Sequence, residues 1–111
     1  MQISEEKIAD VLAVRLKGRL DATTSKSVEE YLLKQIDAGE RIFVLDLAHL
    51  DYISSVGLRV FMVAAKRLKV LQGRMVICAL QVPIRQLFEI SGFATMFPMF
   101  EDRDAAVKGV R

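Results

Sequence analysis

The chain has 111 residues, and its 16 Lys and Arg against 14 Asp and Glu leave a net charge of +2, which excludes the concentrated basic surface of a nucleic-acid-binding protein. Its content of 52% hydrophobic and 27% charged residues excludes a disordered chain and predicts one folded domain over residues 1–111. The N-terminal stretch MQISEEKIAD is too polar for a signal peptide and no apolar run is long enough to cross a bilayer, so we expect a cytoplasmic protein with no membrane partner.

Two strands are predicted first. The segment Ile3–Ile8 is a loosely patterned edge strand, and Val11–Lys17 is a more apolar strand with hydrophobic residues on both faces. The turn Ala9-Asp10 between them is short enough for a hairpin. The run Gly18–Asp21 is predicted to end the second strand.

A helix and a buried strand follow. The helix is predicted over Ser25–Asp37, with Asp21, Thr23 or Thr24 as its cap and a glycine stop after it. The mostly apolar run Arg41–Leu47 then predicts a strand that is covered on both faces, as in α/β sheets.

The next helix carries the residues of greatest functional interest. It is predicted to begin at Ser54 or Ser55, because serine is a favoured N-cap, and to end near Leu71, before Gln72-Gly73. At about 100° per residue, a core face separates from a basic face. The core face holds Leu58, Phe61, Ala64, Ala65, Leu68 and Leu71, and the basic face holds Arg59, Lys66, Arg67 and Lys69. One stripe, made of Ser55, Arg59, Met62 and Lys66, places a methionine among charged residues behind a serine, and we interpret it as a docking surface.

The rest of the chain continues the alternation of strands and helices. A buried strand is predicted over Arg74–Leu80, a helix from Pro83 to Ile90, a short edge strand over Met96–Phe100 that contains a proline, and a final helix over Asp102–Lys108. The order ββαβαβαβα predicts a single α/β domain. Its sheet is expected to be mixed, with four or five strands, and to carry helices mainly on one side.

An enzyme would need a constellation that this sequence lacks. His49 is the only histidine, no serine has the flanking glycines of a nucleophile elbow, and neither a P-loop nor a GxGxxG pattern occurs. One histidine and one cysteine, Cys78 within a buried strand, argue against a zinc site and a disulfide. Asp21, Asp46 and Asp51 at strand ends suggest the carboxylates of receiver domains, but the lysine these need is missing, and caps and turns explain the aspartates. We therefore expect no enzyme activity, metal or cofactor.

The residues alone leave two interpretations of Ser54-Ser55 open. One is a plain N-cap. The other is a phosphorylation switch, because a helix N-terminus tolerates a phosphate and Arg59, one turn on, could partly neutralise it. A partner built for a neutral serine beside Met62 would then meet a buried dianion and be repelled.

The sequence VLDLAHLDYISSVGLRVF, preceded by LKGRLDATTSKSVEEYL, resembles the STAS domain of bacterial anti-sigma factor antagonists. The resemblance covers nearly the whole chain, including the GRLDA turn, the LDL strand, the ISSVGL helix start and a late SGF. It implies that Ser55, two residues before Gly57, is the phosphorylated serine, and that Asp21 in the GxxD turn lies beside it. Ser54 stands where the best-studied members carry aspartate, and Val56 stands where a small residue is common, so Ser54 is a second candidate acceptor.

The resemblance also implies a partner switch. Unphosphorylated, such a protein binds a serine kinase of the GHKL type that acts as anti-sigma factor; phosphorylated, it releases that kinase, and a PP2C-type phosphatase restores it. The expected partner-binding residues are Asp21, Ser54, Ser55, Gly57, Arg59, Met62 and Lys66. Two alternatives stay open: a switch that controls a target other than a sigma factor, and a non-switched STAS subunit of a larger assembly such as a lipid-transport complex.

Overall fold

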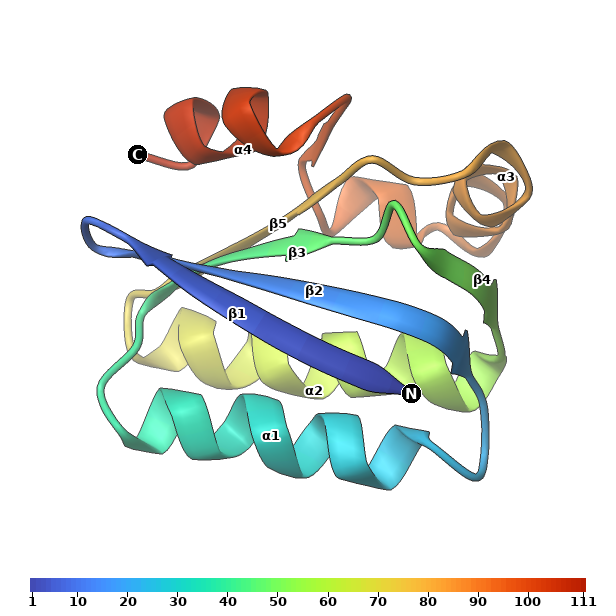
Figure 1. The fold of residues 1–111 in the computed structure, drawn as a ribbon, viewed down its shortest axis with the longest axis horizontal. Helices are drawn as coiled ribbons and strands as arrows, with labels where there is room; N and C mark the ends of the chain where they lie inside the picture. The colour runs from blue at the N-terminus through green and yellow to red at the C-terminus, as the bar shows by residue number, and fades with distance from the viewer.

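Six strands form one mixed sheet in this computed structural model, which describes all residues, 1–111 (Figure 1). The strand order is β1-β2-β3-β5-β6, and β4 lies off this path and pairs with β2. The strands are β1 (Gln2–Ile8), β2 (Val11–Leu20), β3 (Ile42–Asp46), β4 (Leu50–Ile53), β5 (Arg74–Cys78) and β6 (Met99–Phe100). The helices are α1 (Ser25–Asp37), α2 (Ser55–Val70), α3 (Val82–Ser91), the short 3-10 helix η1 (Phe93–Thr95) and α4 (Arg103–Gly109).

Strand pairing follows from the connections. The predicted hairpin is confirmed, because β1 pairs antiparallel with β2 from Ile8↔Val11 outward. The other pairs, β2 with β3 and with β4, β3 with β5 and β5 with β6, are all parallel, as expected where helices return the chain to the same end of the sheet. The predicted α/β domain with a mixed sheet is thereby confirmed.

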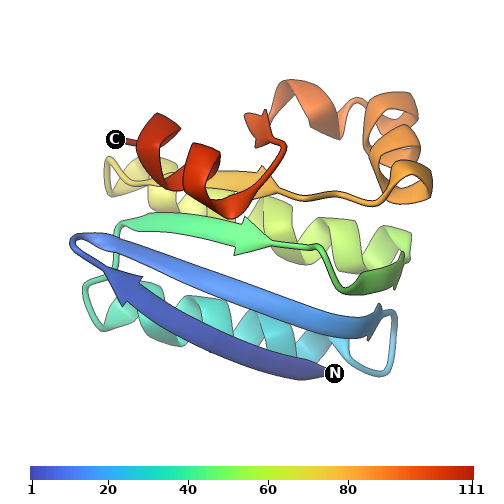
Figure 2. The same cartoon turned by 45° about the horizontal axis from the view of Figure 1, so that its top comes forward.

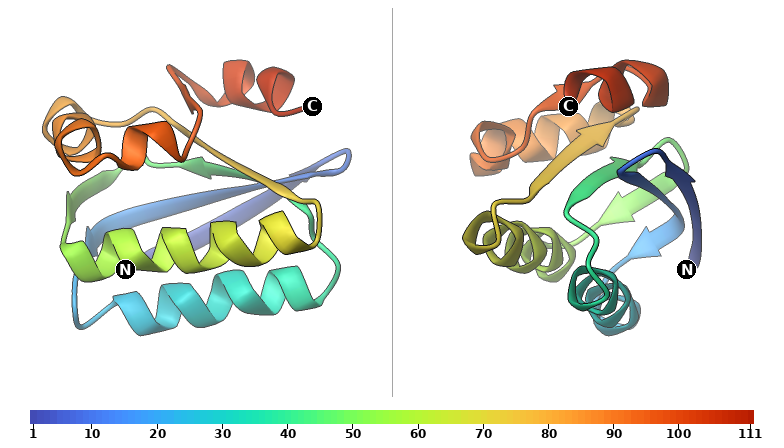
Figure 3. Two further views of the ribbon diagram at one scale, coloured as in Figure 1. Left: turned by 180° about the vertical axis from the view of Figure 1, so that it is seen from behind. Right: turned by 90° about the vertical axis from the view of Figure 1, so that its left-hand side faces the viewer.

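Two apolar cores lie on opposite faces of the sheet. The two longest helices, α1 and α2, run side by side in the same direction and cover one face, while α4 covers the other (Figures 2 and 3). The larger core has 22 buried residues and the smaller, under α4, has seven. Because both faces are covered, the central strand β3 reads as a continuous apolar run in the sequence. None of the helices has both the length and the apolar character needed to cross a bilayer.

The sheet has one strand more than predicted, because β2 does not end where the sequence indicated. Gly18 has a φ of 116°, and the strand register shifts between Gly18 and Arg19, so the backbone bends there and the strand continues to Leu20. This extension pairs with β4, which sequence analysis did not identify. Its four residues are buried only at Leu50 and Ile53, a pattern too short to separate from a polar loop.

Two predicted strands in the second half are shorter than expected. β5 ends at Cys78 rather than Leu80, because Ala79 adopts a φ of 62° that breaks the extended backbone. β6 begins at Met99 rather than Met96, since η1 occupies the preceding residues and Pro98 cannot donate to a ladder. The helix predictions are confirmed within two residues at each end.

The predicted core face of α2 is largely confirmed. Leu58, Phe61, Ala64 and Leu68 are buried, and Ala65 is partly buried. Leu71 was assigned to the core wrongly: it is 42% exposed, because it lies at the C-cap, where the helix ends.

Candidate docking site at the start of α2

Ser54 is the N-cap of α2. Its backbone is extended, with φ −94° and ψ 172°, and its Oγ accepts a hydrogen bond from the Gly57 N–H at 3.3 Å. Its own N–H donates to the Leu20 carbonyl at 2.9 Å, and its carbonyl accepts the Leu58 N–H at 3.0 Å. Of the two predicted caps, Ser54 is therefore the one the structure shows, and its hydroxyl is occupied by the hydrogen bond to the helix.

Ser55 is in a different position. It is the first residue of α2 and is exposed, and its hydroxyl makes no hydrogen bond within the chain. Two adjacent serines therefore differ in availability: one hydroxyl caps the helix, and the other faces solvent in the first turn, where helix N–H groups lack intrahelical partners. The first turn also contains no acidic side chain that would repel an added anion.

Gly57 holds this turn against the sheet. A Cβ at this position would lie 2.8 Å from the Leu20 Cγ, 2.9 Å from the Ile53 Cγ1 and 2.9 Å from the Leu20 carbonyl oxygen. Since the last of these is a backbone atom that cannot rotate away, only glycine lets α2 approach β2 and β4 this closely. Gly57 itself is buried, so it shapes the predicted docking site from beneath.

Asp21 lies in the turn between β2 and α1, and the starts of α1 and α2 lie at the same end of the sheet (Figure 1). Its carboxylate accepts hydrogen bonds from the Thr23 hydroxyl at 2.7 Å and the Thr23 N–H at 3.0 Å, and the Arg19 Nε lies 3.8 Å from its second oxygen. The Thr23 bonds, with a smaller contribution from the Arg19 charge, lower the pKa of the Asp21 carboxyl. The side chain is therefore an anion at neutral pH, and its hydrogen bonds to Thr23 hold it within the turn between β2 and α1.

The N-cap of α1 is Thr24, but its side chain makes no cap hydrogen bond to the helix. Instead, the Thr24 hydroxyl donates to the Arg19 carbonyl at 2.8 Å, and the Asp21 carbonyl accepts the Ser25 N–H at 2.9 Å. Of the three predicted caps, Thr24 is therefore the residue at the N-cap position. Its hydroxyl, however, stabilises the preceding turn and not the first turn of the helix.

Three further residues at this end of the molecule, Arg19, Tyr52 and Val56, were not predicted as docking residues from the sequence. The Arg19 guanidinium lies 4.2 Å from the centroid of the Tyr52 ring, and these two residues pair across β2 and β4. Tyr52 is 41% exposed and Val56 is 46% exposed. Arginine and tyrosine are residue types that protein interfaces favour, and Val56 adds exposed apolar surface beside Ser55. Tyr52 was not predicted because β4 was not: without this strand, the sequence around Tyr52 is typical of a polar loop.

The other predicted docking residues lie along the helix from Ser55. Arg59 and Lys66 are exposed, and Met62 is partly buried. Neither Arg59 nor Lys66 forms an ion pair, whereas the neighbouring Arg67 lies 3.6 Å from the Asp37 carboxylate. The structure thus places Ser55, Arg59, Met62 and Lys66 on accessible surface; their role in binding remains a prediction.

The remaining titratable candidates have structural roles. Asp46 is buried, accepts a hydrogen bond from Arg15 at 3.0 Å and another from the Ala48 N–H at 3.1 Å, and Asp51 is exposed on β4. His49 is exposed in the loop before β4. The predicted burial of Cys78 in a strand is confirmed, and burial, together with the nearby Asp46 charge, raises the pKa of its thiol to about 12. No group of three His, Cys, Asp or Glu side chains is arranged to hold a metal ion.

Comparison with known proteins identifies close relatives. The family model of the STAS domain matches residues 2–106. A proposed anti-sigma factor antagonist of Bordetella bronchiseptica, BtrV, is 44% identical over 106 residues, which cover 96% of this chain and 91% of the relative. The anti-sigma F factor antagonist of Paenibacillus polymyxa is 31% identical over 92% of this chain and 88% of its own. A crystal structure of a proposed anti-sigma factor antagonist from Thermotoga maritima superposes with a TM-score of 0.94 over 98% of this chain and 94% of its own, at 14% identity.

Proposed function

This chain belongs to the STAS domain family and is homologous to anti-sigma factor antagonists, and from this premise we propose that it is a protein-binding switch controlled by phosphorylation of Ser55. In the unphosphorylated state it binds a serine kinase of the GHKL type that serves as anti-sigma factor. Phosphorylation releases that partner, and a PP2C-type phosphatase resets the switch. The relatives' names, which describe antagonists of anti-sigma factors, support this class of partner.

One observation carries the choice of acceptor. Ser55 is exposed with an unbonded hydroxyl, whereas the Ser54 hydroxyl accepts the Gly57 N–H. A kinase can therefore reach Ser55 without breaking the cap of α2. Phosphorylation of Ser54 would instead modify the oxygen that accepts the Gly57 N–H, so the cap would have to be rebuilt around the phosphate.

The position of Ser55 lets the fold accept the phosphate. A phosphoserine carries roughly −1.5 to −2 charges, which the positive end of the helix dipole and the unpaired first-turn N–H groups favour. Arg59 follows at i+4 and has no carboxylate partner of its own. Phosphorylation would consequently act on the complex and leave the fold of the free protein intact.

The proposed contact surface surrounds Ser55. It consists of the predicted Asp21, Ser54, Ser55, Arg59, Met62 and Lys66, to which we add Arg19, Tyr52 and Val56; the predicted Gly57 is buried beneath this surface and shapes it without contacting the partner. An exposed tyrosine and valine would be desolvated by a partner, and a dianion among them would then be buried without its hydration. In this proposal ATP and catalysis belong to the partner kinase; the chain itself carries no cofactor, binds no nucleic acid and works in the cytoplasm.

The test is a capture experiment with purified protein as bait in host lysate, with and without ATP, followed by mass spectrometry of the bait. We expect recovery of a GHKL-type kinase, phosphate on Ser55 only when ATP is present, and loss of the kinase from that sample. Ser55→Ala should keep the partner in the presence of ATP, and Ser55→Asp should reduce its recovery without ATP. Phosphate on Ser54 alone would move the site, and a stable partner that ignores both variants would refute the switch.

A further inference from the structure

The strand β5 lacks a strand partner along part of its outer side, beside the C-terminal half of α2. β5 pairs with β3 along its whole length, from Ile42↔Arg74 to Asp46↔Cys78. On its other side it pairs with β6 only at Ile77↔Met99 and Cys78↔Phe100. The first three residues of β5 therefore have no strand partner on this side, although the side chains of Met75 and Val76 pack into the two cores and leave these residues 6% and 4% exposed.

The backbone of Met75 faces this edge. In a parallel ladder, the N–H and C=O of one residue point to the same neighbouring strand, and successive residues alternate. The Arg74 N–H donates to the Arg41 carbonyl, on the β3 side, at 2.7 Å, while the Ile77 N–H donates to the Pro98 carbonyl, on the β6 side, at 3.0 Å. Met75 consequently directs both of its backbone groups away from β3, where no strand of this chain covers them.

Pro98 explains why the edge stays open. Continuing β6 upstream would require residue 98 to donate its N–H to the Met75 carbonyl, and proline has none. The preceding residues turn into η1 instead, with the Met96 N–H bonded to the Phe93 carbonyl at 3.0 Å. Pro98 therefore prevents β6 from extending along the first half of β5.

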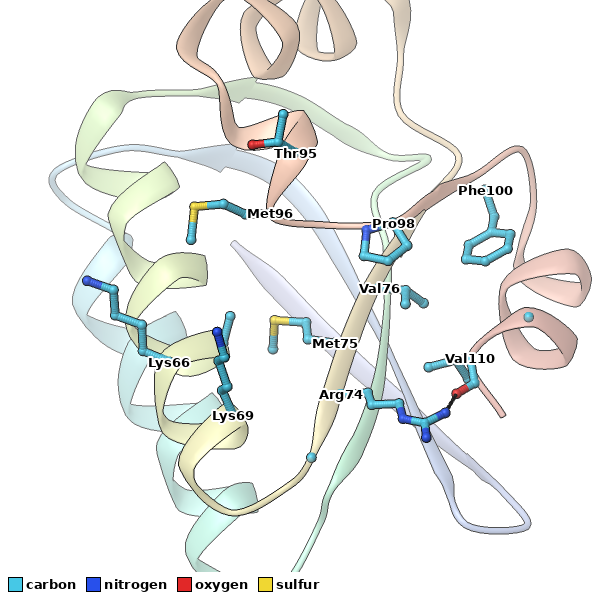
Figure 4. Close-up of a pocket in the computed structure, with 13 residues that line it drawn as sticks. Lys66, Lys69, Arg74, Met75, Val76, Thr95, Met96, Pro98, Phe100 and Val110 are labelled. Carbon is cyan, nitrogen blue, oxygen red and sulfur yellow. Dashed lines mark hydrogen bonds between the residues drawn. The ribbon is translucent and has the colours of Figure 1, made fainter.

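A groove of about 660 Å³ lies over this edge. Figure 4 looks onto β5: Met75, Met96 and the two lysines lie on the α2 side, and Val76, Phe100 and Val110 lie on the α4 side. An added strand would fill both halves, because its side chains alternate between the two faces of the sheet. A groove that wraps a strand edge in this way fits an extended peptide.

The charge of the groove selects the occupant. Its lining includes Lys66, Lys69 and Arg74 and no carboxylate. None of these three cations forms an ion pair within the chain, although Arg74 donates to the Val110 carbonyl at 2.9 Å. The same edge of a second copy would be repelled by like charge. The opposite edge strand β1 is also a poor occupant, since its Glu5 and Glu6 are already bound to Tyr31 and Arg103.

We propose that this groove binds an extended acidic segment of another protein, which adds to β5 as a strand and pairs with the Met75 backbone. The segment carries apolar side chains that alternate between the methionine half and the Phe100 half, with carboxylates placed against Lys66 and Lys69. At a rise of 1.5 Å per residue, Lys69 lies about 21 Å along α2 from Ser55, so this site is centred away from the phosphorylation switch and shares only Lys66 with its proposed contact surface.

The test selects short random peptides, displayed as a library, on the intact protein, and measures the affinity of the enriched peptides by fluorescence anisotropy. We expect enriched peptides to alternate apolar residues and to contain Asp or Glu, and Lys69→Glu to weaken their binding by about tenfold or more. Lys34→Glu is the matched control, because Lys34 is an exposed lysine in the last turn of α1, as Lys69 is in the last turn of α2. Ser55→Ala should leave the affinity unchanged, which separates this site from the switch.

A second measurement addresses the binding mode. N-methylation of one peptide amide at a time should abolish binding only at the amide that donates to the Met75 carbonyl, and should leave binding unchanged at the two neighbouring amides, which face away from β5. Failure to enrich any peptide, enrichment without acidic residues, insensitivity to Lys69→Glu, or N-methylation without effect at every position would each overturn the proposal. So would concentration-dependent self-association that Lys69→Glu abolishes, since a second copy would then occupy the groove.

Discussion

The two ends of α2 are held to the sheet in similar ways but leave the backbone in different states. At the start of the helix, Gly57 lets the chain approach the Leu20 carbonyl, and beyond its end Gly73 does the same, because a Cβ there would lie 2.5 Å from the Arg41 carbonyl oxygen. At the first end the Ser54 hydroxyl accepts the Gly57 N–H, and β4 pairs with the extension of β2 beside the helix start. At the second end the Met75 backbone faces an open edge.

This difference bears on how each end can recognise a partner. At the start of α2 a partner meets exposed side chains such as Tyr52 and Val56, and one added phosphate among them can change the result. Where an edge is open, backbone hydrogen bonds carry much of the affinity, and a single side-chain modification changes less of it. Our two proposals therefore place a switchable site at the start of α2 and a constitutive one at its end.

The largest effect is expected from the two glycines. Gly57→Ala and Gly73→Ala should each lower the free energy of unfolding by about 3 kcal/mol, because the new Cβ would press against a carbonyl oxygen of a neighbouring strand. Urea denaturation measures this, with Val56→Ala, a truncation at an exposed position, as the control. If one glycine variant proved as stable as the parent, the close approach of that glycine to the sheet would not be needed to hold its end of α2.

A smaller effect, confined to partner binding, is expected at Tyr52. Tyr52→Ala should weaken capture of the kinase by about 2 kcal/mol, as for a tyrosine at the centre of an interface. Its effect on unfolding should be smaller, since the ring is 41% exposed and loses mainly its contact with Arg19. Titration of the captured partner with the variant gives the affinity. Unchanged affinity would remove β4 from the docking surface.

The adjacent serines give the next test. Ser54→Ala should destabilise the fold by about 1 kcal/mol, because it removes the hydrogen bond to the Gly57 N–H, whereas Ser55→Ala should change stability by less than about 0.5 kcal/mol. Thermal or urea unfolding of both variants measures the contrast. Equal losses would mean that the two hydroxyls share the cap and that Ser55 is less available than the geometry indicates.

The smallest effect concerns pH and Asp21. Because the folded-state pKa of Asp21 lies below its ordinary value of 3.8, the stability it contributes is present above that value and is lost as the pH falls through the lowered pKa. Asp21→Asn should therefore be less stable than the parent near neutral pH and match it in acid. Urea midpoints across this range measure the effect, with Asp51→Asn on exposed β4 as the control. A difference that persists in acid would assign the loss to packing.

The sequence was sufficient for most elements of the fold. The 3.6-residue period of Ser25–Asp37, the apolar run around Phe43 and the serine before Gly57 are local patterns whose meaning does not depend on distant residues. The same patterns placed Ser55, Arg59 and Lys66 on exposed surface and Cys78 in the core. Asp21 was identified through the GxxD turn, and the structure accounts for its local bonding.

The sequence could not identify features that depend on contacts between distant segments. β4 is only four residues long and exists because the β2 extension beyond Gly18 offers it a ladder, so neither the strand nor the exposed Tyr52 had a local signature. Leu71 continued the apolar period of α2, but the helix ends at Val70, one residue before it, so Leu71 does not face the core. The open edge at Met75 likewise arises from the spatial relation of β5 to Pro98.

By itself, then, the sequence determined an α/β domain with a serine-headed helix, because periodicity and capping are properties of neighbouring residues. The tertiary structure alone decided which of two adjacent serines caps that helix and which part of β5 lacks a strand partner. The first outcome depends on the Leu20 carbonyl, more than thirty residues from Ser54, and the second on where Pro98 lies beside β5; no local pattern encodes such contacts.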